Sequence, residues 1–140
     1  MKYVLDSSVA FKWLVPEVDT DKALRIRDAF NQNHFELIAP DILAVEVTHA
    51  LTRAERQGRL TPAQGVVLLT DLLKNLPQLH NYLPLLPRAY EVSSTMRIGV
   101  YDCLYLALAE QESCEFITAD VKLTNLKAQF PFLTPLSSMP

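Results

Sequence analysis

Apolar residues in this chain form short continuous runs separated by longer stretches with helical spacing. The first run, Lys2-Tyr3-Val4-Leu5, gives way to an acid and two hydroxyls, Asp6-Ser7-Ser8. A run of this kind predicts a buried strand, and its carboxyl end is expected at Asp6. Four more segments have strand character: Phe35–Ala39, Leu79–Leu83, Phe116–Thr118 and Phe132–Leu136.

Between these runs, apolar residues recur three or four positions apart, which is typical of helices with one buried face. The clearest example is the set Leu43, Val47, Ala50, Leu51 and Ala54. Helices are expected over Val9–Val15, from Thr20 or Asp21 to Asn31, from Asp41 to just before Gly58, over Pro62–Asn75, from Pro87 towards Arg97, around Cys103–Ala109, and over Val121–Phe130. Ser8 and Asp41 are the expected caps of the first and third helices. The two long helices on either side of Gly58 predict an αα-hairpin.

The alternation of strands and helices predicts the fold class. Strands separated by helices over 140 residues indicate a three-layer α/β/α sandwich with a mainly parallel central sheet. With 49% hydrophobic and 21% charged residues, the chain is long enough to bury a substantial core. We therefore expect residues 1–140 to form a single domain.

Charge and cysteine content restrict the class of protein. Thirteen Lys and Arg residues against 16 Asp and Glu give a net charge of −3, which argues against a broad basic surface for nonspecific nucleic-acid binding. The two cysteines, Cys103 and Cys114, form no C-x-x-C pattern, and the reducing cytoplasm is the expected location. No apolar run approaches the roughly 20 residues of a membrane span, so no membrane association is expected.

Four acids stand at the ends of apolar elements. Asp6 follows the first strand, Glu46 lies at the edge of a buried helix face, Asp102 falls in the first turn of an apolar helix, and Asp120 follows Phe116–Thr118. Each alone is explained as a helix cap or strand end. Together they predict one cluster, because the carboxyl ends of parallel strands open on a common crevice. Clustered carboxylates repel one another, so a hard cation, Mg²⁺ or Mn²⁺, is the expected partner.

Other chemistries have little support in the sequence. The three histidines show no metal-ligand spacing, and His49 on a helix is better explained as a hydrogen-bonding residue. Ser7 and Ser8 lack the turn that exposes a nucleophilic serine, so Ser8 is expected to support Asp6. Three glycines provide no phosphate-binding loop. The basic side chains on the segments flanking the acids are candidates for phosphate contact, with a solvated helix face as the alternative.

These residues resemble the PIN domain family and, within it, the VapC-type toxin ribonucleases. The resemblance rests on four short motifs in order: Asp6-Ser7-Ser8, Pro40–Val47 with Glu46, Tyr101–Ala109 with Asp102, and Thr118-Ala119-Asp120. It implies that Asp6, Glu46, Asp102 and Asp120 are the catalytic, metal-binding acids, with Ser8 beside the first. Two positions depart from the family pattern: His49 stands where Asn is frequent, and Cys103 where a small residue is frequent.

The resemblance also implies a function. It predicts an Mg²⁺-dependent (or Mn²⁺-dependent) endoribonuclease that hydrolyses RNA, the toxin of a toxin–antitoxin pair, forming a homodimer and binding a small protein antitoxin. The alternatives are a receiver-like, non-enzymatic α/β module and an Mg²⁺-dependent phosphatase. A receiver needs paired acids beside the first strand, and one large phosphatase class needs Asp-x-Asp where this chain has Asp6-x-Ser8. Five apolar residues are expected in the core or, in part, at a subunit interface: Phe11, Trp13, Val66, Val67 and Leu69.

Overall fold

The computed structural model describes residues 1–140 and contains one five-stranded sheet in the order β3-β2-β1-β4-β5. Every neighbouring pair of strands is parallel. The strands are β1 Lys2–Leu5, β2 Glu36–Pro40, β3 Gln78–His80, β4 Glu115–Thr118 and β5 Leu133–Pro135. The predicted fold class, a three-layer α/β/α sandwich on a parallel sheet, is confirmed.

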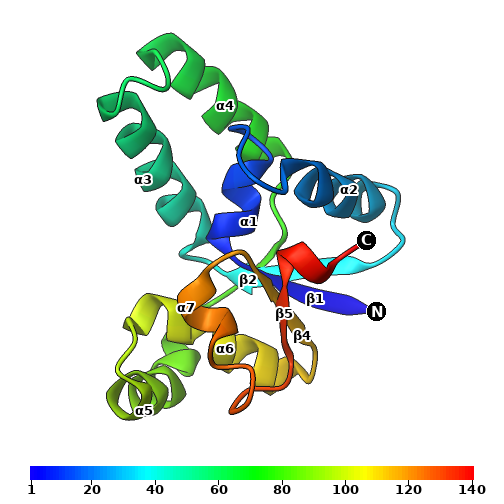
Figure 1. The fold of residues 1–140 in the computed structure, drawn as a ribbon, viewed down its shortest axis with the longest axis vertical. Helices are drawn as coiled ribbons and strands as arrows, with labels where there is room; N and C mark the ends of the chain where they lie inside the picture. Colours follow the sequence, from blue (N-terminus) through cyan, green and yellow to red (C-terminus); the bar gives the residue numbers. More distant parts are fainter.

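Helices cover both faces of the sheet. They are α1 Ser7–Lys12, α2 Thr20–Asn31, α3 Leu43–Arg56, α4 Pro62–Lys74, α5 Leu86–Met96, α6 Val100–Glu112 and α7 Val121–Thr124, with short 3₁₀ turns η1 Leu83–Leu85 and η2 Leu136–Ser138. In Figure 1, α1 to α4 lie on one side of the sheet, and α5 and α6 lie on the other. The hairpin of α3 and α4, here called the α3–α4 arm, extends away from the sheet (Figure 1).

The sheet topology creates a crevice beside β1. Val4 of β1 is paired with Ile38 of β2 on one side and with Phe116 of β4 on the other. The connections from β1 and β4 therefore leave in opposite directions, which makes the carboxyl ends of these two strands the topological switch point of the sheet. Asp6 follows β1 directly, and Asp120 lies two residues beyond β4.

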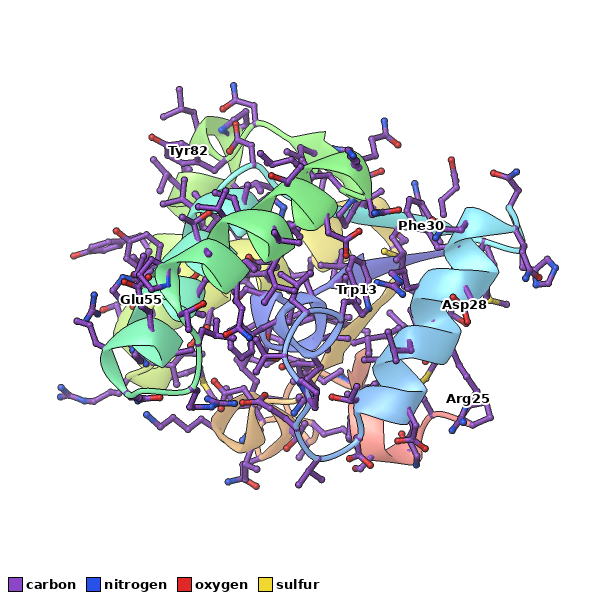
Figure 2. All side chains as sticks on the ribbon, turned by 90° about the horizontal axis from the view of Figure 1, so that it is seen from above. Trp13, Arg25, Asp28, Phe30, Glu55 and Tyr82 are labelled. Carbon is purple, nitrogen blue, oxygen red and sulfur yellow. The ribbon has the colours of Figure 1, made fainter.

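Helix α6 supplies much of the core. All seven residues from Cys103 to Ala109 are buried, as the apolar sequence of this segment predicts, and α6 packs against β1, β2 and β4. On the opposite face, Trp13 is buried between α1 and α2 and donates its indole N–H to the Ala23 carbonyl at 2.9 Å. Figure 2 shows Trp13 inside the molecule, whereas Arg25 and Asp28 lie on the outer side of α2.

Two predicted helix starts are wrong because other groups use the capping side chains, whereas α2 begins at Thr20 as predicted. Helix α1 begins at Ser7 with Asp6 at its N-cap position, and the Ser8 hydroxyl bonds to Asp6 instead of capping. Asp41 accepts the Tyr82 backbone N–H at 3.2 Å, and α3 starts after it, at Leu43. Asp19, in a left-handed conformation, precedes α2.

Other differences concern the extent and exposure of elements. Helix α7 ends at Thr124, well short of Phe130, and β3 begins at Gln78, one residue before the predicted strand, and stops at His80. Val66 and Val67, expected in the core, are 65% and 67% exposed, because α3 covers only one side of α4. Phe11 and Trp13 are buried as expected, while Leu69 is half-buried. None of the helices is both long enough and apolar enough to cross a membrane.

Candidate active site

Asp6 is a buried carboxylate at the carboxyl end of the central strand. Its side chain is held by three hydroxyls: Thr118 donates to Oδ2 at 2.5 Å, Ser8 donates to Oδ2 at 3.1 Å, and Ser7 lies 3.3 Å from Oδ1. Burial raises the pKa of the Asp6 carboxyl, while the hydrogen bonds from Thr118 and Ser8 oppose the rise. The hydroxyls thus fix the position of a carboxylate that water reaches poorly.

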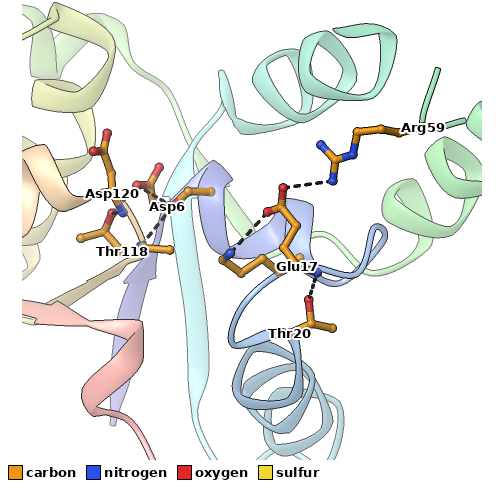
Figure 3. A network of polar contacts seen from close by, with 9 residues as sticks. Asp6, Glu17, Thr20, Arg59, Thr118 and Asp120 are labelled. Carbon is orange, nitrogen blue, oxygen red and sulfur yellow. Dashed lines mark hydrogen bonds and ion pairs between the residues drawn. The ribbon is translucent and has the colours of Figure 1, made fainter. Parts of the chain in front are cut away.

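The hydroxyls of Thr118 and Ser8 also tie Asp6 to the loop after β4. Thr118 Oγ1 accepts the Asp120 backbone N–H at 3.0 Å, and Ser8 Oγ accepts the Ala119 N–H at 3.1 Å. Asp120 Oδ1 in turn accepts the Lys122 N–H at 2.9 Å and caps α7. Figure 3 shows Asp6, Thr118 and Asp120 grouped at the ends of β1 and β4. The structure therefore places Asp6 and Asp120 together, as the switch-point argument predicts.

Glu46 reaches the site from the first turn of α3. Its Oε1 accepts the Tyr105 hydroxyl at 2.6 Å, and Tyr105 is fully buried on α6, with its ring stacked on Phe116 at a centroid distance of 5.8 Å. Burial raises the pKa of Glu46, the Tyr105 hydrogen bond lowers it, and the charge of Asp6 raises it further. Tyr105 therefore fixes one oxygen of Glu46 and leaves the other available.

The negative charges of Asp6, Glu46 and Asp120 all raise the pKa of Asp102. It lies half-buried in the first turn of α6, and its pKa is raised to about 7, first by burial and then by the negative charges of Asp6, Asp120 and Glu46. Lys122 opposes this rise. A carboxyl whose pKa is raised by three others must share their electrostatic environment. The four predicted acids are thus brought into one region, from four separate segments of the chain.

Each of the four acids also lies at the start of a helix. Asp6 and Asp120 occupy the N-cap positions of α1 and α7, and Glu46 and Asp102 lie in the first turns of α3 and α6. Unpaired N–H groups and the positive ends of helix dipoles favour anions at these positions. This local effect offsets part of the repulsion within the cluster.

The chemistry of these donors suits a hard divalent cation, which binds oxygen ligands. A cation would relieve the mutual repulsion that raises the pKa of Asp102. However, no three His, Cys, Asp or Glu side chains are arranged to coordinate one ion together. Mg²⁺ does not require three such ligands, because it usually binds one or two carboxylates directly and keeps several waters.

One cation near the site, Lys12, is already engaged in an ion pair. Lys12 on α1 lies 3.3 Å from Glu17, which also pairs with Arg59 at 3.2 Å, and Thr20 Oγ1 accepts the Glu17 backbone N–H at 2.8 Å. Figure 3 shows this network beside Asp6. It links the loop after α1 to the turn of the α3–α4 arm. Lys12 is therefore held in an ion pair with Glu17, whereas the charge of Lys122 lowers the pKa of Asp102.

Sequence reasoning missed the roles of Thr118 and Tyr105. Both lie inside apolar runs and look like ordinary core positions, yet both donate hydrogen bonds to the acids. For Thr118 the available signal was its hydroxyl two residues before Asp120, since such hydroxyls often bond to the backbone two residues on. For Tyr105 the available signal was its hydroxyl within an apolar segment predicted to be buried, because a buried hydroxyl needs a hydrogen-bond partner.

Comparison with known proteins gives a consistent result. The family model described as "PIN domain" matches residues 3–128. The chain is 32% identical over 135 residues to "Ribonuclease VapC3" of Pyrobaculum aerophilum, covering 95% of this chain and 98% of that protein. Among solved structures, PAE2754 from Pyrobaculum aerophilum superposes with a TM-score of 0.71 at 20% identity, covering 99% of this chain and 91% of that one. VapBC2 from Rickettsia felis, bound to a DNA fragment from its promoter, gives a TM-score of 0.67 at 16% identity, covering 96% and 97%.

Proposed function

The chain belongs to the PIN domain family, and we propose that it is a metal-dependent endoribonuclease and the toxin of a toxin–antitoxin pair. One observation carries the proposal: four acids from separate segments meet at the carboxyl end of the sheet, where burial and the negative charges of the other three raise the pKa of Asp102 to about 7. The similarity to a ribonuclease over nearly its full length supports RNA as the substrate. The proposal takes residues 1–140 as one domain acting in the cytoplasm, where both cysteines remain free thiols.

Asp6, Glu46, Asp102 and Asp120 would hold Mg²⁺ or Mn²⁺, directly or through water. When bound, the ion supplies an activated water for in-line attack on a phosphodiester and neutralises charge on the phosphate and the leaving oxygen. The protein's contribution is orientation. The Thr118 and Ser8 hydroxyls hold Asp6, and the Tyr105 hydroxyl holds Glu46, so that two acids keep fixed rotamers.

Asp102 is an acid whose ionisation would respond to a bound cation. With a pKa of about 7 it is partly protonated at neutral pH, and a bound cation would favour its ionised form. The number of charges at the site thus depends on the ion. This predicts that metal binding by Asp102 releases protons near neutral pH.

The exposed apolar surface of the α3–α4 arm supports a homodimer. Val66, Val67 and Leu73 are 65%, 67% and 55% exposed on one helix, α4. Next to them is an apolar pocket of about 460 Å³ that includes Leu14 and Leu68. A second copy of the chain would cover surface of this kind, since clustered exposed apolar side chains mark protein interfaces.

An antitoxin partner is proposed on the similarity to VapC proteins. In this proposal the antitoxin is a small protein that blocks the acid cluster until it is removed. Mass spectrometry of a complex purified with the product of the adjacent gene would test it. An adjacent product that does not bind the chain would count against the pairing without affecting the ribonuclease proposal.

The ribonuclease proposal is tested by incubating total RNA with wild-type protein and with Asp6→Asn side by side. We expect the wild type to cleave RNA with Mg²⁺ and to stop with EDTA, and Asp6→Asn to be inactive with Mg²⁺. Lys74→Gln, which changes an exposed residue in the last turn of α4, outside the acid cluster, is the control for handling and charge. Cleavage that persists in EDTA, or that Asp6→Asn retains, would contradict the proposal.

A further inference from the structure

An open pocket of about 480 Å³ adjoins the acid cluster. It is bounded at one end by Glu46 and by Ser7, whose hydroxyl lies 3.3 Å from Asp6 Oδ1. Its other walls include His49, Arg53 and Tyr101. Its volume falls in the range of roughly 300–1,000 Å³ that is usual for ligand sites. Any polymer whose backbone crosses the acids would have a neighbouring unit within reach of this pocket.

Tyr101 gives the pocket an exposed aromatic surface. It lies in the first turn of α6, directly before Asp102, and is 61% exposed. The other strongly exposed tyrosine, Tyr90, is on α5 and lines none of the pockets beside the acids. Aromatic side chains that face solvent beside a nucleic-acid site serve as platforms on which bases stack.

Arg53 gives the pocket a cation with no acidic partner. Arg25, Arg27, Arg59 and Arg88 each form an ion pair with a carboxylate. Arg53 forms none, and its Nη2 lies 3.3 Å from His49 Nε2 one turn earlier on α3. The imidazole therefore orients a guanidinium whose other donors remain available. Such a planar fork matches the oxygens of a phosphate.

From these features we propose that the pocket binds a nucleotide of single-stranded RNA next to the phosphate that is cleaved. In this arrangement the base stacks on Tyr101, and Arg53, oriented by His49, contacts the adjoining phosphate. The inference rests on the proposed function and deepens it by assigning a substrate subsite. It also accounts for how an acidic centre in a chain of net charge −3 attracts a polyanion.

Single-stranded RNA suits this pocket better than a duplex. A base can stack on Tyr101 only if it is turned out of any helix, and A-form duplexes keep their bases stacked within. An acidic segment of a protein partner would also pair with Arg53, but it would leave the exposed ring of Tyr101 without a matching surface. The combination of an aromatic ring, an unpaired arginine and adjacent metal-binding acids therefore favours a nucleotide.

The test measures binding of a short fluorescent single-stranded RNA by anisotropy, in an Asp6→Asn background that prevents cleavage. Tyr101→Ala and Arg53→Gln are each expected to weaken binding about tenfold. Tyr101→Phe should bind as the parent does, because stacking does not need the hydroxyl. The matched controls are Tyr90→Ala and Arg56→Gln, which change an exposed tyrosine and an exposed arginine outside the pocket, and both should bind within twofold of the parent.

Salt dependence separates the two contacts. Losing one phosphate contact should reduce the slope of log Kobs against log salt concentration by about 0.7 for single strands. Arg53→Gln should show this reduction, and Tyr101→Ala should keep the parental slope. A general loss of structure would not divide the two variants in this way, and melting temperatures with Mg²⁺ verify that both still fold.

The subsite and the proposed function fail in different ways. If the wild type cleaves RNA and both pocket variants bind RNA with parental affinity, the subsite is overturned and the ribonuclease proposal stands. The pocket would then be left as a surface for a protein partner. If the wild type neither binds nor cleaves RNA, the proposed function fails and the subsite fails with it.

Discussion

The cluster of Asp6, Glu46, Asp102 and Asp120 holds charged groups that are buried or half-buried, whereas the α3–α4 arm exposes apolar side chains. Asp6 is a carboxylate with 3% of its surface exposed, while Val67 is an apolar side chain with 67% exposed. Burying charge and exposing clustered apolar surface both lower stability or solubility unless a partner compensates. Under the proposed function, a cation compensates the buried carboxylates and a second copy of the chain covers the apolar surface of the arm.

The two regions differ in how they are built. The acids come from four distant segments. Thr118 and Ser8 tie Asp6 to the loop that carries Asp120, Tyr105 holds Glu46, and no buried side-chain polar atom in the molecule lacks a partner. The arm is a local hairpin, whose second helix starts with a capping box between Thr61 and Gln64. The cluster therefore depends on the whole fold, whereas the arm can change its surface without disturbing the sheet.

Removing one charge from the cluster should have the largest effect. Asp102→Asn is expected to lower the rate of RNA cleavage on the order of 10³-fold, equivalent to about 4 kcal/mol of transition-state stabilisation, while the fold is retained. Cleavage rates with Mg²⁺ and circular dichroism measure the two parts. An active variant, or one that unfolds, would return Asp102 to the role of a helix-terminal residue.

Adding a charge to the arm should break the proposed dimer and spare the cluster. Light scattering of the wild type at micromolar concentration is expected to give twice the 15.8 kDa chain mass. Val67→Asp should give the monomer mass, because it places a carboxylate in the apolar surface of α4. Val18→Asp, at an exposed valine outside the arm, is the control and should remain dimeric. A wild type that is monomeric throughout would contradict the interface.

Mg²⁺ should stabilise the cluster by mass action. At a concentration 100 times Kd, a ligand that binds only the folded state adds about 2.7 kcal/mol to the free energy of unfolding. Melting temperature should therefore rise with the logarithm of Mg²⁺ concentration in the wild type and much less in Asp6→Asn. An equal rise in both proteins would show that the ion acts elsewhere.

A smaller effect is expected from pH in the absence of metal. The pKa of Asp102 is about 7 in the folded protein and 3.8 for the free side chain, so between these values the folded state binds more protons than the unfolded state. The free energy of unfolding should then fall as pH rises from about 4 to 7, by about 1–2 kcal/mol after allowing for solvent screening at this half-buried group. The pKa values of Asp6 and Glu46 are also raised, so these two acids likewise make the free energy of unfolding fall as pH rises.

Melting in EDTA between pH 5 and pH 8 measures this dependence. The wild type should melt at lower temperature as pH rises, and Asp102→Asn should show a weaker trend. Stability that increases with pH in the wild type would mean that the acids do not repel one another in the folded chain.

Sequence patterns predicted the sheet well and the helix caps poorly. Apolar runs that end at Asp6 and shortly before Asp120 marked β1 and β4, because a buried parallel strand excludes polar residues along its length. The caps failed because Ser8 donates to Asp6 and accepts the Ala119 N–H, and Asp41 accepts the Tyr82 N–H. The contacts with Ala119 and Tyr82 are distant in sequence, and no local pattern reveals them. Helical periodicity likewise identified the apolar residues of α4 without showing which of them α3 would cover.

The acids of the candidate site were predictable from the sequence, but the residues that hold them in place were not. The ends of the apolar runs and the family resemblance together singled out four acids, and the structure places those four near one another. The supporting residues Thr118 and Tyr105 were missed because a hydroxyl inside an apolar run has the same pattern as core. Their role depends on contacts between residues 112 and 59 positions apart.

The central claim, that the four acids hold a divalent metal directly or through water, is tested most directly by Mn²⁺ titration of isotopically labelled protein, followed by NMR. Paramagnetic Mn²⁺ should broaden the backbone amide signals of Asp6, Glu46, Asp102 and Asp120 at substoichiometric concentration, and leave those of Val66 and Val67 on the arm sharp. Asp102→Asn should need far more Mn²⁺ for the same broadening. Broadening that spreads over exposed acids such as Asp21 and Glu91, with the four cluster amides unaffected, would contradict the account.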